Sequence, residues 1–545
     1  MVSCSILSLC LARRPSRPLW LELSTTADAK FTKRCTLLRL HYPLPQDMRP
    51  RRRAYLSPMR YLLYFPLLCL LACEAALDRN EYGVFETTVL SNLTPRLTGD
   101  GEIVDAHDGR VIQFGDRYYW YGTAYGETNG FTPANTYVSY SSPDLKTWTY
   151  EGPLLPERPE GVYYRPHVVH NVRTGKYVLW YNWYPKLWEG QFGVATSDTP
   201  AGPFTILSDD VPVSRSAEGV GDLGVFVDDD GTAYLSYNTI NNHRVSIERL
   251  DADYTGSTLE NGGIIAEHAE AGAQFKRDGK YYLLTDVTCC FCNYGSGARV
   301  YMSDDPISDY RFTGNINRHP GRPAPGLTDG VRTGTDYTTL QRRDTVFEAV
   351  EWRSNDYLEF DRVLLTLFTG NRPENCGDAS NPRVHAPYTA PRFTVEAYRA
   401  GEWETLSVID TAVATNALNQ TVALQLPPTS AYRLRVRPDT THAFGRVFVS
   451  ELALESATQA VDWPADARAY VTGPGIPRRP IIPAQQSFVL DLGDDLYSWQ
   501  GDMWGSASDN VKGHDYQYWS APLRFREDGT IAPLAWVDEW AVAAR

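Results

Sequence analysis

One pattern of aromatic residues recurs along the chain, and it constrains the fold more than any other feature. The segment "DRYYWYG" at 116–122 is followed by "GKYVLWYN" at 175–182, "GTAYLSYN" at 231–238, "GKYYLLTD" at 279–286 and "DDLYSWQGD" at 494–502. Each segment starts with a turn and continues as a strand-length run rich in aromatic and aliphatic residues. The tyrosines Tyr118, Tyr177, Tyr234 and Tyr281 are 59, 57 and 47 residues apart, which is typical of four-stranded propeller blades.

The segments around these runs complete the blades. An apolar run such as "RVIQF" or "LGVFVD" precedes each of the first four turns, and a further strand-like segment follows each hairpin. Helical periodicity is almost absent between them. The sequence therefore predicts an all-β fold, a five-bladed β-propeller in which most of the residues Tyr118 to Tyr121 pack between blades.

A long insertion separates the fourth blade from the fifth. Proline-rich stretches, "NRHPGRPAPG" at 317–326 and "GPGIPRRPIIPA" at 473–484, bracket short alternating segments that favour a β-sandwich of about 140 residues. We predict a leader at 1–78, propeller blades one to four at 79–326, the inserted sandwich at 327–478 and blade five at 479–545. The sandwich resembles galactose-binding-like modules, which predicts either glycan binding or a bracing role.

The N-terminus is typical of an export signal. Arginines are frequent in 48–60, and the twelve residues 61–72 are apolar, which is too short to span a bilayer but suits a signal peptide. The segment ends in "LLAC", so either a lipid anchor on Cys73 or ordinary cleavage near Ala75 or Ala76 is expected. We predict a secreted, outer-surface or periplasmic protein, with membrane contact only through such an anchor.

Charge and cysteine content exclude other classes. Residues 1–73 hold twelve Lys/Arg and three Asp/Glu, so the net charge of -14 for the whole chain leaves -23 for the rest, which repels nucleic acid. Only Cys289, Cys290, Cys292 and Cys376 follow the leader. No histidine pair at zinc spacing accompanies "CCFC", so we expect a local disulfide or packed thiols and no metal ligands.

Acidic residues stand at the start of three predicted innermost strands: Asp108, Asp222 and Glu270. Innermost strands line the axis of a propeller, so their entrances converge. Clustered carboxylates raise one another's pKa, and one can stay protonated while another is an anion, as glycoside hydrolysis requires. Blades two and five offer other polar residues there, namely Arg165, His167 and Gln485. By contrast, Asp228 to Asp230 precede Gly231 and are interpreted as turn residues.

At these motifs the chain resembles glycoside hydrolase family 43. The likeness runs through "HDGRVI", "YRPHVVHNVRTGKYVLWYN", "GDLGVFVDDDGTAYLSY", "EAGAQFKRDGKYYLLT" and "IPAQQSFVL" with "GDMW", and it is nearest to the exo-β-1,3-galactanase branch. It implies an inverting mechanism with Asp108 as general base, Asp222 as pKa-tuning or substrate-holding carboxylate, and Glu270 as general acid. Two positions depart from that branch, which has a glycine-rich segment near Asp108 and a glutamate in place of Tyr164.

Further residues are expected to contact a polysaccharide or oligosaccharide substrate. Aromatic platforms and hydroxyl-binding groups are needed for sugar recognition. The candidates are His107, Tyr164, Arg165, His167, Trp183, Gln485 and Trp504. No cofactor is expected to be required, although some relatives hold a structural calcium on the axis.

Two other functions fit the same features. One is a non-catalytic carbohydrate-binding protein on the same fold, with the altered motifs reflecting lost catalysis. The other is a propeller scaffold for protein partners, which predicts rim aromatics without converging acids. The three retained carboxylates favour the hydrolase.

Overall fold

The computed structural model describes residues 87–128, 130–287, 290–291, 297–331, 336–369, 389–399, 401–412, 419–441 and 445–543. The described chain consists of β-strands and of three short 3-10 helices: η1 (Ser216–Glu218), η2 (Pro325–Leu327) and η3 (Lys512–His514). Within these residues no helix has the length and apolar character that crossing a membrane requires. The predicted signal segment and Cys73 lie outside the described residues.

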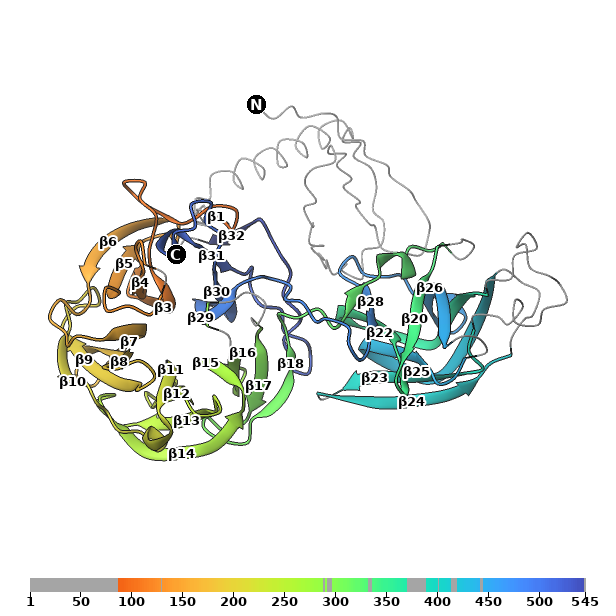
Figure 1. Ribbon diagram of the computed structural model, residues 1–545, viewed down its shortest axis with the longest axis horizontal. Coiled ribbons are helices and arrows are strands. Elements are labelled where there is room, and N and C mark those ends of the chain that lie inside the picture. The colour runs from red at the N-terminus through yellow and green to blue at the C-terminus, as the bar shows by residue number, and fades with distance from the viewer. Residues whose placement is uncertain are drawn as a thin grey trace, which may run out of the picture. The chain divides into compact units, whose positions relative to one another are not determined.

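Five sheets radiate from a common axis as propeller blades, as the sequence predicted, and they are antiparallel except for the parallel pair β2 and β6 of blade one (Figure 1). Blade one contains β2 (Leu97–Thr98), β3 (His107–Phe114), β4 (Arg117–Ala124), β5 (Thr136–Ser142) and β6 (Thr147–Pro153). Blade two contains β7 (Val162–Asn171), β8 (Lys176–Tyr184), β9 (Gln191–Ser197) and β10 (Thr205–Ser208). Blade three contains β11 (Val220–Val227), β12 (Ala233–Thr239), β13 (Val245–Leu250) and β14 (Ser257–Ala266). Blade four contains β15 (Ala269–Arg277), β16 (Lys280–Val287), β17 (Arg299–Ser303) and β18 (Arg311–Asn315). Blade five contains β29 (Gln485–Gly493), β30 (Leu496–Met503) and β31 (Tyr516–Trp519).

The ring closes through the innermost strands and through the ends of the described chain. Each of β3, β7, β11, β15 and β29 contacts the innermost strands of the two neighbouring blades. The first described strand, β1 (Thr87–Ser91), pairs with β32 (Glu539–Ala543) beside blade five. Both segments bond to the same blade-five residue, because Asn92 Nδ2 and Trp540 Nε1 each donate to the Trp519 carbonyl.

The aromatic repeat packs neighbouring blades against each other. Tyr118 and Trp120 lie in a cluster with Leu490 and Trp519 of blade five, whereas Tyr121 lies with Tyr181 of blade two. Side chains alternate across a strand, so one aromatic run serves both neighbours. The prediction that most of these residues are core residues is confirmed, with Tyr119 only partly buried.

The segment between blades four and five forms a separate ten-stranded sheet. Its strands are β19 (Arg322–Pro323), β20 (Thr338–Arg343), β21 (Val346–Phe347), β22 (Ala349–Phe368), β23 (Arg392–Arg399), β24 (Glu402–Asp410), β25 (Asn419–Pro438), β26 (Arg446–Ser456), β27 (Gln459–Ala460) and β28 (Arg468–Thr472). Both halves of β22 face one core, since Val350 and Trp352 share a buried cluster with Val363 and Leu365. The sheet is therefore curled around its own core, consistent with the predicted inserted sandwich.

The strands of this insertion are longer than the sequence predicts. The end of the alternating segment "TVFEAVEW" and the segments "DYLEFD" and "VLLTLF" belong to the single strand β22, and "QTVALQL" and "AYRLRVRP" belong to β25. The pairing of β22 with β25 shifts register between Arg353 and Leu358 and again between Phe360 and Arg362. Such irregularities bend a strand without ending it, which is why the sequence pattern looks interrupted. The exact domain boundaries stay a prediction.

Candidate active site

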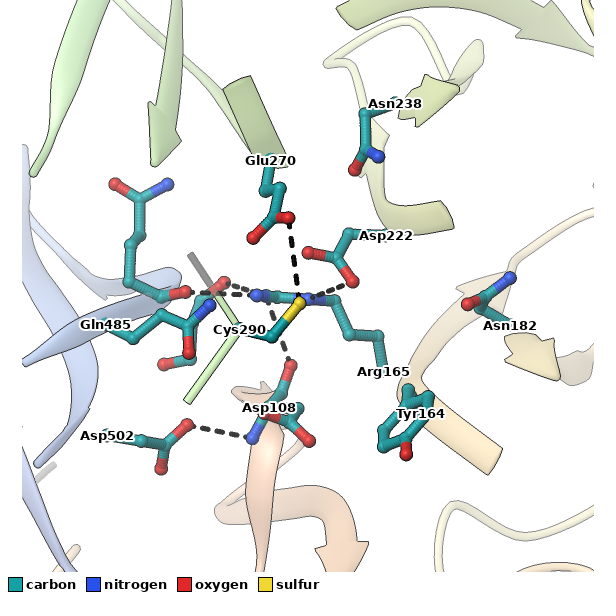
Figure 2. A network of polar contacts seen from close by, with 12 residues as sticks. Asp108, Tyr164, Arg165, Asn182, Asp222, Asn238, Glu270, Cys290, Gln485 and Asp502 are labelled. Carbon is teal, nitrogen blue, oxygen red and sulfur yellow. Dashed lines mark hydrogen bonds and ion pairs between the residues drawn. The ribbon is translucent and has the colours of Figure 1, made fainter. Parts of the chain in front are cut away.

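A cavity of about 550 Å³ opens where the innermost strands begin, and all five blades contribute to it. Its lining residues are Asp108, Tyr125, Phe131, Tyr164, Arg165, Tyr184, Trp188, Gly221, Asp222, Asn238, Ile240, His243, Glu270, Cys290, Phe291 and Gln485. Figure 2 shows how Asp108, Asp222 and Glu270 surround the guanidinium of Arg165. The three predicted carboxylates are thus brought together, although they are far apart in the sequence.

A register shift occurs at the same place in every blade, between the innermost strand and its neighbour. The shifts fall between His107 and Arg110, Tyr164 and His167, Val220 and Leu223, Glu270 and Ala273, and Gln486 and Val489. A bulge re-aims the side chains beside it and is frequent near active sites. The five bulges therefore turn Asp108, Arg165 and Asp222 toward the axis, with Glu270 and Gln485 immediately before the bulges of blades four and five.

Two of these bulges hold non-glycine residues in a left-handed conformation. Asp108 has φ of 62° and Arg165 has φ of 50°. Gly109 follows Asp108, and a Cβ atom there would lie 1.8 Å from the carbonyl oxygen of Tyr121. Glycine is thus required beside Asp108 by close contact with β4, and the strain of the left-handed residues is maintained by the surrounding hydrogen bonds.

Arg165 closes the axis beneath the cavity. Its side chain is 3% exposed, and its Nε lies 3.0 Å from Asp222 Oδ1. The guanidinium also donates to the carbonyl oxygens of Asp108, Gln486 and Ser487 at 3.4, 3.3 and 3.2 Å. Burial alone would lower the pKa of Arg165, but Asp222 and Asp108 raise it, so a permanent cation ties blades one, two, three and five together.

Asp108 is a buried carboxyl group with a pKa suited to proton transfer. Burial and the nearby Asp502 carboxylate raise its pKa to about 6, against the opposing effects of Arg165 and of the Tyr125 hydroxyl. That hydroxyl donates to Asp108 Oδ2. Because the pKa lies close to neutrality, the Asp108 carboxyl can exist in either protonation state near pH 6.

His107 and Asp502 support Asp108 from below. Asp502 Oδ2 accepts the backbone N–H of Asp108 at 2.9 Å, and Asp502 Oδ1 lies 2.9 Å from His107 Nδ1. Burial opposes the protonation of His107, but Asp502, Asp105 and Asp108 outweigh it and raise its pKa to about 9. His107 is therefore an imidazolium paired with Asp502, and it is 1% exposed.

Glu270 lies on the opposite side of the cavity from Asp108, as Figure 2 shows. It is 5% exposed, and His243 Nδ1 lies 3.5 Å from its Oε1. The Cys290 thiol donates to the same oxygen at 4.0 Å. Burial, Glu270 and Asp222 raise the pKa of this thiol to about 12, so it stays protonated and remains a donor.

Gln485 presents one defined group to the cavity. Its Oε1 accepts from Trp504 Nε1 at 2.8 Å and from the backbone N–H of Phe291 at 3.2 Å. Both partners can only donate, which fixes the orientation of the amide. The NH2 group of Gln485 is consequently left as a donor for a ligand.

The aromatic rim candidates Tyr184 and Trp188 line the cavity, whereas two further lining residues were not singled out from the sequence. Tyr125 and Asn238 belong to the ends of the second strands of blades one and three, where motif reasoning gives no signal. Asn238 is 2% exposed, and its Oδ1 accepts no protein hydrogen bond. The hydroxyl of Tyr164, which was predicted, also has no protein partner. Both atoms lack a protein partner in residues that line the cavity.

Four residues expected to bind substrate do not line the cavity. His167 and Trp183 are core residues, because His167 Nδ1 accepts from the Val225 N–H and Trp183 Nε1 donates to the Asp209 carbonyl. His107 and Trp504 lie behind the cavity and hold Asp502 and Gln485. The sequence could not separate these cases, since alternation along a bulged strand is interrupted at the bulge.

The described residues offer no metal site. No group of three or more His, Cys, Asp or Glu side chains among them is arranged to hold an ion. Arg165 occupies the axis beneath the cavity, where a calcium ion would meet a cation. Cys290 is a free thiol. The other cysteines that follow the leader lie outside the described residues; they are Cys289, Cys292 and Cys376.

Residues 103–324, blades one to four, match the family model of glycosyl hydrolases family 43. No curated protein matches the sequence. Among solved structures, the chain is similar to an exo-β-1,3-galactanase from Clostridium thermocellum, with 19% identity, 84% of this chain and 67% of that chain covered, and a TM-score of 0.46. It is also similar to a family 43 β-1,3-galactosidase solved with galactodeoxynojirimycin, with 16% identity, 83% and 99% covered, and a TM-score of 0.47. A putative exo-β-1,3-galactanase from Bifidobacterium bifidum has 15% identity, 82% and 97% covered, and a TM-score of 0.42. Residues 103–324 thus match glycosyl hydrolases family 43 in the blades that converge on a carboxylate-lined cavity, and the protein is an O-glycosyl hydrolase.

Proposed function

We propose that the protein is an exo-acting glycosidase that inverts the anomeric centre and releases terminal β-1,3-linked galactose. The observation that carries the proposal is the cavity in which Asp108 and Glu270 approach from opposite sides and Asp222 lies beside Arg165. An inverting glycosidase needs one protonated carboxyl at the leaving oxygen and one carboxylate that activates water on the other face of the sugar.

Glu270 is proposed as the general acid. The Cys290 thiol, with its high pKa, and the nearby His243 border its carboxyl group as two neutral neighbours. Burial lowers the pKa of His243, which keeps that imidazole neutral. The proton of Glu270 passes to the glycosidic oxygen as the bond to the anomeric carbon breaks.

Asp108 is proposed as the general base. With a pKa of about 6, it is ionised at neutral pH and takes a proton from the water that attacks the anomeric carbon. Tyr125 and Asp502 fix its side chain and backbone. Asp222, held by Arg165, provides a negative charge toward the oxocarbenium-like transition state.

The closed floor of the cavity supports the proposed exo mode. Arg165 and its hydrogen bonds close the axis beneath the cavity, which suits the binding of a terminal sugar. Tyr164, Asn238 and Gln485 offer a hydroxyl, a carbonyl and an NH2 group to the terminal sugar. The choice of galactose rests on the blade-five motif: Asp502 and Trp504 of "GDMW" are the residues that hold Asp108 and Gln485.

We also propose that the protein is exported, with a lipid on Cys73 or cleavage near Ala75. This rests on the arginine-rich and apolar segments of the leader alone. Mass spectrometry of the mature N-terminus from the native host tests it. A mature chain that still begins before residue 48 would contradict export by this signal.

The test of function is a substrate panel. The protein is incubated with β-1,3-galactan, arabinan and xylan oligosaccharides, and released monosaccharide is measured, with Glu270→Gln as the matched variant. We expect galactose from the galactan oligosaccharides only, and its loss in the variant. Binding without turnover on every substrate would instead support a carbohydrate-binding role, and turnover of xylan or arabinan alone would overturn the choice of sugar.

A further inference from the structure

A second hollow of about 1070 Å³ adjoins the catalytic cavity between blades two and three. It shares two lining residues with that cavity, Trp188 and Ile240. Its other lining residues are Glu189, Gly190, Gln191, Phe192, Asp210, Val211, Ser216, Ala217, Glu218, Gly219, Val220 and Asn241. We call this hollow the blade 2–3 cleft. Because the two spaces share residues, a ligand that leaves the cavity on this side enters the cleft.

Trp188 stands at the boundary of the two spaces with its ring in solvent. Its side chain is 52% exposed, and its φ of 70° lies in the left-handed region. The turn is held by the Glu189 N–H, which donates to the Lys186 carbonyl at 2.8 Å. The indole contacts Phe131 at 5.5 Å between ring centroids. A large apolar ring kept in water at the mouth of a cavity is typical of a binding surface, and flat aromatic rings suit the apolar faces of pyranose rings.

One side of the cleft is connected to Glu270 through the chain. One loop makes the connection: Ile240 and Asn241 line the cleft, and His243, two residues further, lies 3.5 Å from Glu270 Oε1. A general acid protonates the oxygen of the leaving group. The part of the substrate that departs is therefore expected to extend from Glu270 along this loop.

The chemistry of the lining fits a neutral chain of hydroxyl groups. Ser216, Gln191 and Asn241 supply donors and acceptors, and Glu189, Asp210 and Glu218 supply carboxylates. The residues that line the cleft include no Lys, Arg or His; Lys186 and Arg215 pair with Glu189 and Glu218 from outside the lining. Arg244 also lies 3.6 Å from Glu218, so cations balance most of these carboxylates and the cleft suits an uncharged sugar chain.

The glycine in the wall allows the two blades to meet. A Cβ atom on Gly190 would lie 1.9 Å from the carbonyl oxygen of Val220, so only glycine lets the blade-two loop contact β11. The wall of the cleft is therefore continuous, and its shape is set by close backbone contact.

We propose that the blade 2–3 cleft binds the leaving-group part of the substrate, a neutral oligosaccharide of at least two pyranose units, with Trp188 as its first stacking platform. This inference rests on the proposed function, because it assigns Glu270 to the leaving-group side. The substrate then has at least three sugar units: the terminal sugar in the cavity and two or more in the cleft.

The test measures binding, so that turnover is not needed. Isothermal titration of full-length Glu270→Gln protein with β-1,3-galactose oligomers of one to four units gives affinity against length. We expect affinity to rise about tenfold from the disaccharide to the tetrasaccharide. Trp188→Ala and Asn241→Ala remove this gain, Asn241→Ala leaves binding of galactose unchanged, and the neighbouring exposed Leu187→Ala is the matched control with no effect.

The outcomes separate this proposal from the proposed function. Equal affinity for all lengths, or a length gain that survives both Trp188→Ala and Asn241→Ala, overturns the cleft while hydrolysis stands. A length gain lost in these variants, in a protein whose wild type hydrolyses nothing, supports the cleft and overturns the hydrolytic assignment. Failure of every oligosaccharide to bind overturns both.

Discussion

The two ends of the innermost propeller strands carry the same residue type in opposite electrostatic states. At the entrance, Asp108 is buried and its pKa is raised to about 6. At the exit of blade three, Asp228 is also buried, yet its pKa is lowered, because Lys276, Tyr281 and the Asp229 N–H outweigh the effect of burial. Burial is therefore not what distinguishes a reactive carboxyl group from a structural one. The difference lies in whether cationic and neutral donors stabilise the charged form.

The largest effect is expected at the entrance, from Glu270→Gln. The amide keeps the shape of the side chain but has no proton to give to the leaving oxygen. We expect kcat/KM for galactan oligosaccharides to fall about 10³- to 10⁴-fold, measured by release of galactose. A loss below tenfold would mean that another group protonates the leaving oxygen.

Asp108→Asn sharpens the comparison from the base side. The variant keeps the contact with Tyr125 and loses the carboxylate that activates water, so kcat is expected to fall about 10²- to 10³-fold. KM changes little, because the loss is in the chemical step. Addition of azide, an external nucleophile that needs no base, should restore part of the rate, and absence of both the loss and the rescue would remove Asp108 from the mechanism.

The pH dependence of the wild type reports the raised pKa. The base acts in its ionised form, so kcat/KM should fall about tenfold per pH unit below about pH 6 and be level above it until the acid loses its proton. Hydrolysis rates of one oligosaccharide from pH 4 to 8 measure this fall in kcat/KM. If Asp108→Asn showed the same fall below pH 6, the pKa would belong to another group.

Trp504→Phe tests a residue that acts through Gln485. The change keeps an aromatic ring but removes the N–H that orients the amide, so one hydrogen bond of about 1 kcal/mol is lost. We expect KM to rise about fivefold, with little change in the fall of kcat/KM below pH 6. An effect equal to that of Asp108→Asn would show a general collapse of the site.

The smallest effect on activity is expected at the exit, from Asp228→Asn. Turnover should stay within about twofold of the wild type, whereas the free energy of unfolding at pH 7 falls by about 1–2 kcal/mol through loss of the ion pair with Lys276. Because the folded state lowers the pKa of Asp228, this stability is present above the unfolded pKa of about 4 and disappears as the pH falls through the folded value. Urea unfolding at pH 7 and pH 3 measures the difference, which should be smaller at pH 3 than at pH 7.

The sequence predicted the parts of the site that follow from the repeat. The spacing of Tyr118, Tyr177, Tyr234 and Tyr281 gives the blades, and the position of Asp108, Asp222 and Glu270 at the strand entrances gives their convergence. The repeat does not give the register. The five bulges change which side chains face the axis, and they take His167 into the core while Arg165 reaches the centre.

The contacts between blade one and blade five could not be predicted from the sequence either. Asp502 and Trp504 stand about 400 residues after Asp108, and their roles depend on the closed propeller that brings β30 next to β3. Trp183 and Trp188 are five residues apart in the sequence, but Trp183 lies in β8 and is buried, whereas Trp188 follows that strand and is exposed. The end of β8 between them separates the two cases.

The central claim is that Asp108 and Glu270 act on opposite faces of one sugar, and the configuration of the first product tests it most directly. Proton NMR of a β-1,3-galactose oligosaccharide during the first minutes of hydrolysis should show α-galactose, which then mutarotates to the equilibrium mixture. Appearance of β-galactose as the first product would contradict the assignment of Asp108 as a base that activates water.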